Sequence, residues 1–330
     1  MTAEGFQSFD TIIIGAGPIG LACAMELKRR GLRSLILEKG AVADAVRRFP
    51  SAMTFFSTSE LIELGNLPLI SHGPRPTRFE AYKYYTRVAD AEALNIRRYS
   101  EAVSVSSTAD GLKIATSDGH SLSAPTVILA TGYFDQPNTL GVPGEDLPHV
   151  SHYYDEGLRY SRMKAIVVGG QNSACDTALD LFRAGADVTL VHRSEMLGRS
   201  VKYWVRPDIE NRIQKGEIAA RFAHELVAIA PEHVRVRDLR SGSIDEIPGS
   251  FVFLMTGYRP DLRLLKSAGV SVDAESLIPK FDAGSFETNV PGLYVAGSII
   301  AGKRTSDIFI ENGRIHASII ADHIRNRFER

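Results

Sequence analysis

The sequence predicts an α/β protein made of two Rossmann-like, three-layer ββα domains, with the second domain inserted in the first. A pattern of apolar strand, glycine turn, helix and strand occurs at the start of the chain and again near its middle. Two further apolar strands, residues 126–132 and 251–257, both end in Thr-Gly and are followed by proline-bearing loops. Such paired strands suit a chain that leaves one domain and later returns to it.

Length and composition are those of an ordinary globular protein with more than one domain. The 330 residues include 38 basic and 39 acidic ones, so the net charge is -1 and no basic stripe supports a nucleic-acid partner. No apolar run is long enough to span a bilayer, and residues 1–9 lack the pattern of a secretory signal. We therefore expect a cytoplasmic protein that binds neither nucleic acid nor membrane.

The first strand–turn–helix unit begins at residue 10. Residues 10–14 form a β-branched run that predicts a buried parallel strand. Residues 18–30 predict a helix, with Pro18 in its first turn and Gly31 after its end. Residues 34–37 predict the next strand.

The turn Gly15-Ala16-Gly17-Pro18-Ile19-Gly20 matches the G-x-G-x-x-G fingerprint. Its first glycine permits a tight turn, its second lets the backbone approach a pyrophosphate, and its third lets helix and strand pack closely. The helix N-terminus then offers unpaired N–H groups to the phosphates. Glu38 ends the next strand, where a carboxylate accepts the hydroxyls of an adenosine ribose and repels a 2′-phosphate. The sequence therefore predicts FAD or NAD at this turn, and not NADP.

The second unit follows the same plan, with strands at residues 165–168 and 188–191 around a helix that ends near Arg183. Its turn, Gly169-Gly170-Gln171-Asn172-Ser173-Ala174, has the G-x-x-x-x-A form. Gln171 takes the place of the second glycine, and its effect on the approach of a pyrophosphate is left open. All six residues of this turn are predicted to contact a nucleotide.

Basic residues follow the second unit at the place where the first unit has its acidic residue. His192 and Arg193 end the strand, and Arg199 and Lys202 come shortly after. Cations pair with a 2′-phosphate, and the guanidinium fork suits it especially well. We predict NADPH at this turn, held by His192, Arg193 and Arg199. The alternative is a solvated basic face without a ligand.

The closing segment, residues 288–297, predicts a turn and an apolar strand, followed by Ser298 and a final helix from residue 308 to about 328. A helix N-terminus that points at the N1–C2=O edge of a flavin would stabilise negative charge there. The residues predicted to hold FAD are Gly15, Gly17, Pro18, Ile19, Gly20, Glu38, Lys39, Phe55, Ala130, Thr131, Gly132, Gly297 and Ser298. The first domain is expected to comprise residues 1–139 and 258–330, and the second residues 140–257.

Together these motifs resemble the low-molecular-weight thioredoxin-reductase-like flavoproteins. The resemblance rests on GAGPIG with Glu38, LATG, GGQNSA, VHR and NVPGLYVAG. Three longer segments, residues 49–67, 201–213 and 308–316, resemble most closely the bacillithiol-disulfide reductase family. The resemblance implies an NADPH-dependent flavin oxidoreductase with FAD in the first domain, NADPH in the second and a homodimeric assembly. It implies no metal, and no catalytic residue is assigned.

Three departures from these families concern the chemistry. Residues 150–157 read VSHYYDEG, where thioredoxin reductases carry a C-x-x-C pair. Ser298 replaces an aspartate that binds the flavin's ribityl and phosphate region. Ile19 replaces a cysteine that members of the bacillithiol family often carry in the first glycine turn. Only Cys23 and Cys175 remain, and we expect both to be packing residues, although Cys23 lies one helical turn beyond Ile19.

Aromatic and histidine residues leave further alternatives open. Phe49, Phe55 and Phe56 could pack beside the isoalloxazine or in the core. His152 and the two tyrosines that follow it occupy the place of the missing dithiol, where one of them could cover the flavin or donate a proton.

The electron acceptor is not identified by the sequence. A small-molecule disulfide, such as bacillithiol disulfide, follows from the resemblance, but the absence of a cysteine at Ile19 weakens it. A redox carrier protein, ferredoxin or flavodoxin, needs no thiol and is the alternative. A non-catalytic flavin-bound sensor and a flavin monooxygenase complete the set of hypotheses.

Overall fold

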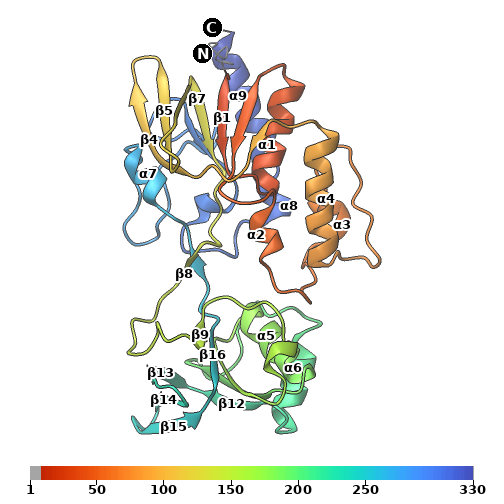
Figure 1. The fold of residues 1–330 in the computed structure, drawn as a ribbon, viewed down its shortest axis with the longest axis vertical. Coiled ribbons are helices and arrows are strands. Elements are labelled where there is room, and N and C mark those ends of the chain that lie inside the picture. Colours follow the sequence, from red (N-terminus) through yellow and green to blue (C-terminus); the bar gives the residue numbers. More distant parts are fainter. Residues whose placement is uncertain (1–8, 330) are drawn as a thin grey trace. The chain divides into compact units, whose positions relative to one another are not determined.

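The computed structural model describes residues 9–329, and its chain divides into two compact units. Unit 1 comprises Met1–Arg48, Ser57–Gln136 and Tyr258–Arg330, and unit 2 comprises Phe49–Phe56 and Pro137–Gly257. Figure 1 labels the elements of both units. The short segment Phe49–Phe56, expected within the first domain, is grouped by its packing with unit 2.

Unit 1 is built on a five-stranded parallel sheet with the strand order β18-β7-β1-β2-β3. The strands are β1 Thr11–Ile14, β2 Ser34–Leu37, β3 Ile96–Arg97, β7 Thr126–Leu129 and β18 Leu293–Val295. In register, Ile14 lies beside both Leu37 and Leu129. Three neighbouring strands therefore end together, and their carboxyl ends form one edge.

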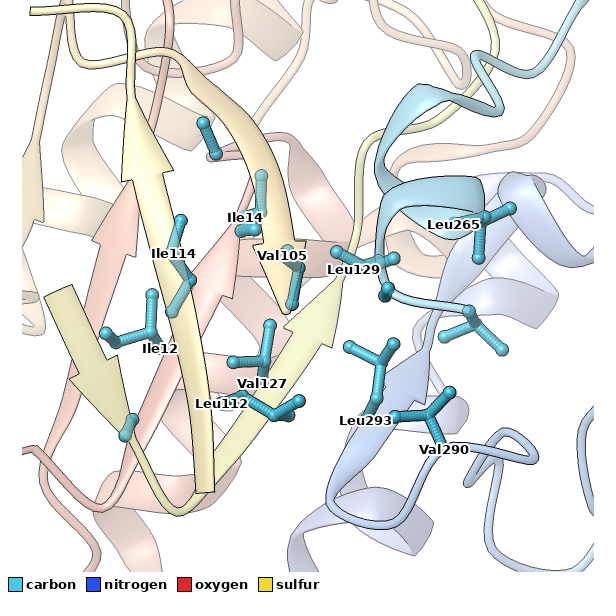
Figure 2. Packing of buried hydrophobic residues seen from close by; sticks show 14 of the residues in the cluster. Ile12, Ile14, Val105, Leu112, Ile114, Val127, Leu129, Leu265, Val290 and Leu293 are labelled. Carbon is cyan, nitrogen blue, oxygen red and sulfur yellow. The ribbon is translucent and has the colours of Figure 1, made fainter. Parts of the chain in front are cut away.

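Side chains that alternate along these strands separate two layers of packing. Ile12 and Ile14 pack with the antiparallel sheet of β4 Ala102–Thr108, β5 Gly111–Thr116 and β6 Ser121–Ala124, in the cluster that Figure 2 shows. Helix α7, Arg263–Ser267, adds Leu265 to that cluster. On the opposite face, α1 Pro18–Arg29 packs beside α9 His316–Phe328 (Figure 1). Unit 1 thus has the predicted three layers.

The remaining elements of unit 1 are short except for one helix. They are α2 Asp44–Arg47, α3 Ser59–Ile62, α4 Arg78–Ala91, η2 Gly297–Ala301 and α8 Ile310–Gly313. Thr77 and Glu80 begin α4 with a capping box, since each side chain bonds the other residue's backbone N–H.

The expected final helix proves to be two helices, α8 and α9, so that prediction is wrong in detail. The hydrogen-bond pattern breaks at Arg314 and Ile315. Tertiary contacts account for the break. A Cβ atom at Gly313 would lie 3.2 Å from Ile19 of α1, and the Arg314 guanidinium donates to the carbonyl of Glu63. The first of the two helices is therefore anchored separately.

Unit 2 repeats the plan with the strand order β12-β11-β10-β16-β9. Its sheet consists of β9 Val150–Ser151, β10 Lys164–Val168, β11 Asp187–His192, β12 Ala219–Phe222 and β16 Phe251–Leu254. Helices α5 Asn172–Arg183 and α6 Arg206–Gln214, with the short η1 Leu158–Tyr160, complete one side. An antiparallel sheet of β13 His224–Ile229, β14 His233–Asp238 and β15 Ile244–Pro248 packs on the other. The predicted α/β class, with two Rossmann-like units, is confirmed.

Two of the chain crossings between the units run side by side. Strand β8, Gln136–Pro137, pairs with β17, Tyr258–Arg259. Next to them the Asn138 N–H donates to the Gly257 carbonyl at 2.9 Å, and the Thr256 hydroxyl donates to the Asn138 carbonyl at 2.7 Å. Within residues 9–329, no helix is long and apolar enough to cross a membrane.

Candidate functional site

The first glycine turn lies where the strand order of the unit 1 sheet reverses. Strand β1 has β2 on one side and β7 on the other, and Gly15 follows it with φ 107°. Helix α1 then begins at Pro18, and its N-cap residue, Gly17, provides no side-chain cap. Open parallel sheets bind ligands at this kind of edge, and an uncapped helix N-terminus suits phosphate.

The three glycines of this turn have different surroundings. A Cβ atom at Gly15 would lie 2.6 Å from the Ala130 carbonyl oxygen, and one at Gly20 would lie 1.9 Å from the Gly15 carbonyl oxygen. A Cβ atom at Gly17 would meet no described atom within 4 Å. The first and third glycines are therefore required by packing, whereas the second faces open space. This arrangement fits a pyrophosphate beside Gly17.

Glu38 is fixed beside the first turn by two backbone groups. Its Oε2 atom accepts the Ala16 N–H at 2.7 Å, and its Oε1 atom accepts the Gly40 N–H at 2.8 Å. The residue is only 7 % exposed. Burial raises the pKa of this carboxyl group, and the two N–H bonds oppose that rise. Each oxygen keeps one further acceptor position, which is the capacity that two ribose hydroxyls require.

Two buried hydroxyl oxygens near this edge have no hydrogen-bond partner among the described residues: Ser100 Oγ and Thr131 Oγ1. Ser100 follows β3, and its N–H donates to the Glu38 carbonyl at 2.9 Å. Thr131 lies two residues beyond the end of β7. Buried polar atoms are nearly always satisfied in a folded protein, so both oxygens are available to a group bound at this edge. The sequence analysis did not identify Ser100, because a lone serine after an edge strand carries no pattern.

Lys39, predicted to contact FAD, is engaged within unit 1. Its ammonium lies 2.7 Å from Asp135 Oδ2, and Arg48 pairs with the same carboxylate. Burial raises the pKa of Asp135, but the hydrogen bonds from Lys39 and Arg48 outweigh it and lower that pKa overall. Lys39 therefore binds Asp135 rather than standing free at the site.

The closing strand ends next to the first turn. Gly297 has φ 75°, and a Cβ atom there would lie 2.9 Å from Ile19. The Ser298 hydroxyl lies 3.7 Å from the place that a Cβ atom of Gly132 would occupy. The structure thus brings together the predicted residues of the fingerprint, of the Thr131–Gly132 turn and of the closing segment.

The second glycine turn occupies the corresponding edge in unit 2. Gly169 follows β10 with φ 144°, and a Cβ atom there would lie 2.5 Å from the Met255 carbonyl oxygen. A Cβ atom at Gly170 would lie 2.4 Å from the imidazole ring of His192. Ala174, in the first turn of α5, is buried and packs behind Gly169, whereas Ser173 is exposed. The imidazole ring therefore lies directly over the turn.

Gln171 is tied to a neighbouring loop, which we call the 198–202 loop. The Ser200 hydroxyl donates to Gln171 Oε1 at 2.7 Å, and the Gly198 N–H donates to the Gly170 carbonyl at 2.8 Å. Asn172 Oδ1 accepts the Lys202 N–H at 2.8 Å, and Asn172 Nδ2 donates to the Ser200 carbonyl at 3.0 Å. Four hydrogen bonds thus hold this loop against the N-terminus of α5.

The basic residues predicted to bind NADPH lie around this loop. Arg199 is an exposed residue within it, and Arg193 is exposed at the end of β11. Burial lowers the pKa of His192, and the nearby Arg193 lowers it further. A neutral His192 leaves the guanidinium groups of Arg193 and Arg199 as the predicted cations here.

The aromatic segment Phe49–Phe56 packs within unit 2. Phe55 is buried and lies against Phe49, with ring centroids 6.1 Å apart. Phe56 stacks on Trp204 at 5.5 Å, and the Lys202 ammonium donates to the Thr54 carbonyl at 3.3 Å. The role of Phe55 beside FAD stays a prediction.

Tyr154 and His152 stand where thioredoxin reductases carry the C-x-x-C pair, and both contact other residues of unit 2. The Tyr154 hydroxyl donates to Asp180 Oδ2 at 2.5 Å, and its ring packs edge-on against Phe253. Burial and Asp180 raise the pKa of Tyr154 well above its ordinary value. His152 Nε2 lies 3.3 Å from Glu145. Tyr154 is thus a packing residue and a poor proton donor.

Both cysteines are buried, as expected for packing residues. Burial raises the pKa of Cys23 to about 12, with a smaller contribution from Glu26. Burial likewise raises the pKa of Cys175 to about 12. A thiol rather than a thiolate is present at neutral pH, so neither sulfur is nucleophilic. Residues 9–329 contain no group of three or more metal-ligating side chains.

Comparisons with known proteins agree with this arrangement. A family model described as pyridine nucleotide-disulphide oxidoreductase matches residues 12–297. The bacilliredoxin reductase Bdr of Bacillus subtilis is 39 % identical over 316 residues, which cover 96 % of this chain and 97 % of that protein. The structure of bacillithiol disulfide reductase Bdr from Staphylococcus aureus has a TM-score of 0.93 at 35 % identity and covers 98 % of this chain and 99 % of that one.

More distant relatives differ in their named activity. A ferredoxin–NADP reductase of Ignicoccus hospitalis is 27 % identical over 88 % of this chain and 90 % of that protein. These relatives and the family model imply a flavin and a nicotinamide nucleotide as cofactors.

Proposed function

The chain belongs to the pyridine nucleotide-disulphide oxidoreductases, and we propose that it oxidises NADPH through an FAD and passes the electrons to a small disulfide. Its bacillithiol disulfide reductase homologues support a disulfide as acceptor. One observation carries the choice of nucleotides. The two glycine turns follow equivalent strands, but Glu38 stands at the first and Arg193 at the second. We also propose a homodimeric assembly, which the family resemblance implies, and a cytoplasmic location.

FAD is proposed for unit 1 because the first turn fits an unphosphorylated ribose. Glu38 is held by Ala16 and Gly40 with acceptor positions to spare, and the space beside Gly17 is open. The unpaired oxygens of Ser100 and Thr131 provide hydroxyl groups for the same ligand. Ser298 adds a neutral donor, where related enzymes have an aspartate.

NADPH is proposed for unit 2 because the second turn has cations where the first has a carboxylate. The hydrogen bond to Ser200 directs the Gln171 carboxamide into the 198–202 loop, and the loop carries Arg199. The Gln171 side chain therefore fixes the loop that carries Arg199, the arginine proposed to bind phosphate. A glycine at this position could not form that hydrogen bond. Bidentate bonds from Arg193 and Arg199 would distinguish NADPH from NADH.

The residues of the chain bind and orient the cofactors, and the redox chemistry belongs to the flavin. A bound FAD would supply the chemistry of hydride acceptance from NADPH and of electron transfer to the acceptor. Ile19 occupies the place of the family's cysteine, and the Cys23 thiol is buried and protonated. The disulfide must therefore be reduced without a thiolate from the described residues.

A redox carrier protein is the second candidate acceptor, and the absence of a cysteine at position 19 favours it. Transfer to a ferredoxin or flavodoxin requires no thiol, so an isoleucine at position 19 is no handicap. The ferredoxin–NADP reductases among the relatives are named for that acceptor, but they are less similar than Bdr.

The test is anaerobic reduction of the purified flavoprotein followed by reoxidation. We expect NADPH to reduce the flavin at least about tenfold more efficiently than NADH, because only NADPH has a 2′-phosphate that Arg193 and Arg199 can bind. The reduced protein is then mixed in parallel with bacillithiol disulfide, ferredoxin and flavodoxin. Reoxidation by the disulfide supports the first candidate, and reoxidation by a carrier alone replaces it with the second.

Ile19→Cys is the matched variant for the acceptor. If the disulfide is the acceptor, a thiol at this position should increase its turnover and leave flavin reduction by NADPH unchanged. A colourless protein that cannot be reconstituted with FAD would contradict the proposal as a whole.

A further inference from the structure

His316 is a buried histidine that the proposed function does not use. It is the first residue of α9 and is 7 % exposed. Its Nδ1 atom lies 3.1 Å from the backbone nitrogen of Gly297. The Gly297 N–H can only donate, so Nδ1 accepts, and the proton of the ring lies on Nε2. The imidazole is therefore neutral in this arrangement.

A strained residue holds the His316 ring in place. Phe286 has φ 60°, which is rare for a bulky side chain, and its ring stacks on His316 at 4.2 Å with an interplanar angle of 26°. Phe281 in turn stacks on the Phe286 ring, with ring centroids 5.8 Å apart. The Phe286 N–H donates to the Asp282 carbonyl at 2.7 Å, and its carbonyl accepts the Val295 N–H. Backbone strain of this kind is concentrated at functional sites.

The backbone that His316 holds belongs to the FAD edge of unit 1. Gly297 begins η2, two residues beyond the closing strand β18, which lies next to β7. It packs against Ile19 of the fingerprint, and Ser298 lies beside Gly132. The histidine thus acts on the turn that joins these three segments.

We propose that neutral His316 is a positioning residue for the FAD, which fixes the Gly297–Ser298 turn against the first glycine turn through its Nδ1 atom. The inference rests on the proposed function, because FAD is the ligand of this edge. Removing the acceptor would leave a buried N–H group unpaired and release the turn. The partial positive charge at the N-terminus of α9 also favours the neutral ring.

The tautomer can be measured directly on the purified flavoprotein. We expect the ¹⁵N NMR spectrum of histidine-labelled protein to show one ring with Nδ1 as an unprotonated acceptor and Nε2 protonated down to about pH 5. His316→Phe identifies that ring among the nine histidines. A His316 ring that carries its proton on Nδ1, or that titrates near pH 6.5, would overturn the inference.

Two variants test what the hydrogen bond does for the cofactor. His316→Phe keeps a ring for Phe286 but has no acceptor, and we expect its FAD dissociation constant to rise about tenfold. His316→Asn restores an acceptor near the Nδ1 position and should bind FAD within about threefold of the wild type. The dissociation constant for NADPH, which belongs to unit 2, should change less than twofold in both variants.

The outcomes separate this inference from the proposed function. If the wild-type protein binds no FAD, the proposed function fails, and the inference fails with it. If the wild type binds FAD but His316→Phe binds it equally well, the inference alone fails. Equal losses in His316→Phe and His316→Asn would show a packing role only. Should both variants fail to fold, the wild-type His316 ring is assigned through its contact with the Phe286 ring, and its tautomer and pH dependence decide.

Discussion

The two glycine turns stand at the same point of two sheets with the same strand order, but their immediate surroundings differ in charge. In unit 1 the strand after the turn ends at Glu38, which is buried and held by backbone N–H groups. In unit 2 the equivalent strand ends at His192 and Arg193, next to a loop with Arg199. On the proposed assignment, the fold determines where a phosphate binds, and the residues that end one strand determine which ribose is accepted.

The turns also differ in how they are held. In the first, Gly17 meets no described atom and α1 has no side-chain cap. In the second, Gln171 and Asn172 hold the 198–202 loop through side-chain hydrogen bonds. The first turn is shaped by backbone packing and the second by side chains, so they should respond differently to substitution.

The largest combined effect, on stability and on FAD binding, is expected from a matched pair of glycine substitutions in the first turn. Gly20→Ala places a methyl group 1.9 Å from a backbone oxygen and should lower the free energy of unfolding of unit 1 by roughly 2–3 kcal/mol. Gly17→Ala meets open space, so the apoprotein should lose less than about 1 kcal/mol. Its added methyl group should weaken FAD binding about 10–100-fold. Thermal unfolding of the apoprotein and FAD titration measure the two effects.

Equal losses of stability in both variants would contradict the distinction between an open Gly17 and a packed Gly20, because Gly17 would then also be required by packing. Normal FAD affinity in Gly17→Ala would show that no pyrophosphate approaches that residue.

The second prediction concerns the cations of unit 2. Arg193→Ala and Arg199→Ala should each raise the KM for NADPH about 10–100-fold and leave the KM for NADH nearly unchanged, because only NADPH carries the 2′-phosphate. Steady-state kinetics with both nucleotides measure the change. Arg235→Ala, an exposed arginine on β14 of the same unit, is the control and should alter neither value. Equal effects on NADPH and NADH would indicate a solvated basic face.

The third prediction concerns pH and unit 1. Burial lowers the pKa of His316 to about 4, from an ordinary value of 6.5. The unfolded chain therefore binds a proton at a higher pH than the folded chain, and stability falls as the pH drops from 6.5 towards 4. The expected loss is about 3 kcal/mol. Chemical denaturation of wild type and His316→Phe across this range measures it, and the difference between them should vanish if His316 titrates normally when folded.

The individual strands and the two glycine turns could be predicted because their signals are local. Short continuous apolar runs, a proline at the start of α1 and glycines at Gly15 and Gly169 are visible without knowledge of the fold. The predicted strand at residues 34–37 agrees with β2, Ser34–Leu37. Glu38 and Arg193 could be nominated because they stand at fixed places after these strands.

Other features depend on contacts between distant residues and leave no local signal. The final helix is divided because Gly313 packs against Ile19, far away in the sequence. Segment Phe49–Phe56 joins unit 2 through Trp204 and Lys202, although its neighbours on both sides belong to unit 1. The hydrogen bond between Gly297 and His316 also joins residues that are not neighbours in the sequence. Sequence periodicity reports which face is buried, but not which distant residue it meets.

The smallest effect is expected at the side chains that distinguish the second turn from the first. Ser200→Ala removes the donor to Gln171 Oε1, and Gln171→Gly removes the acceptor while restoring the usual glycine. Each should raise the KM for NADPH about two- to fivefold, the effect of one neutral hydrogen bond that holds the loop with Arg199. The double variant should equal the single ones, since both remove the same bond. Tighter NADPH binding in Gln171→Gly would show that the carboxamide obstructs the pyrophosphate and does not serve the loop.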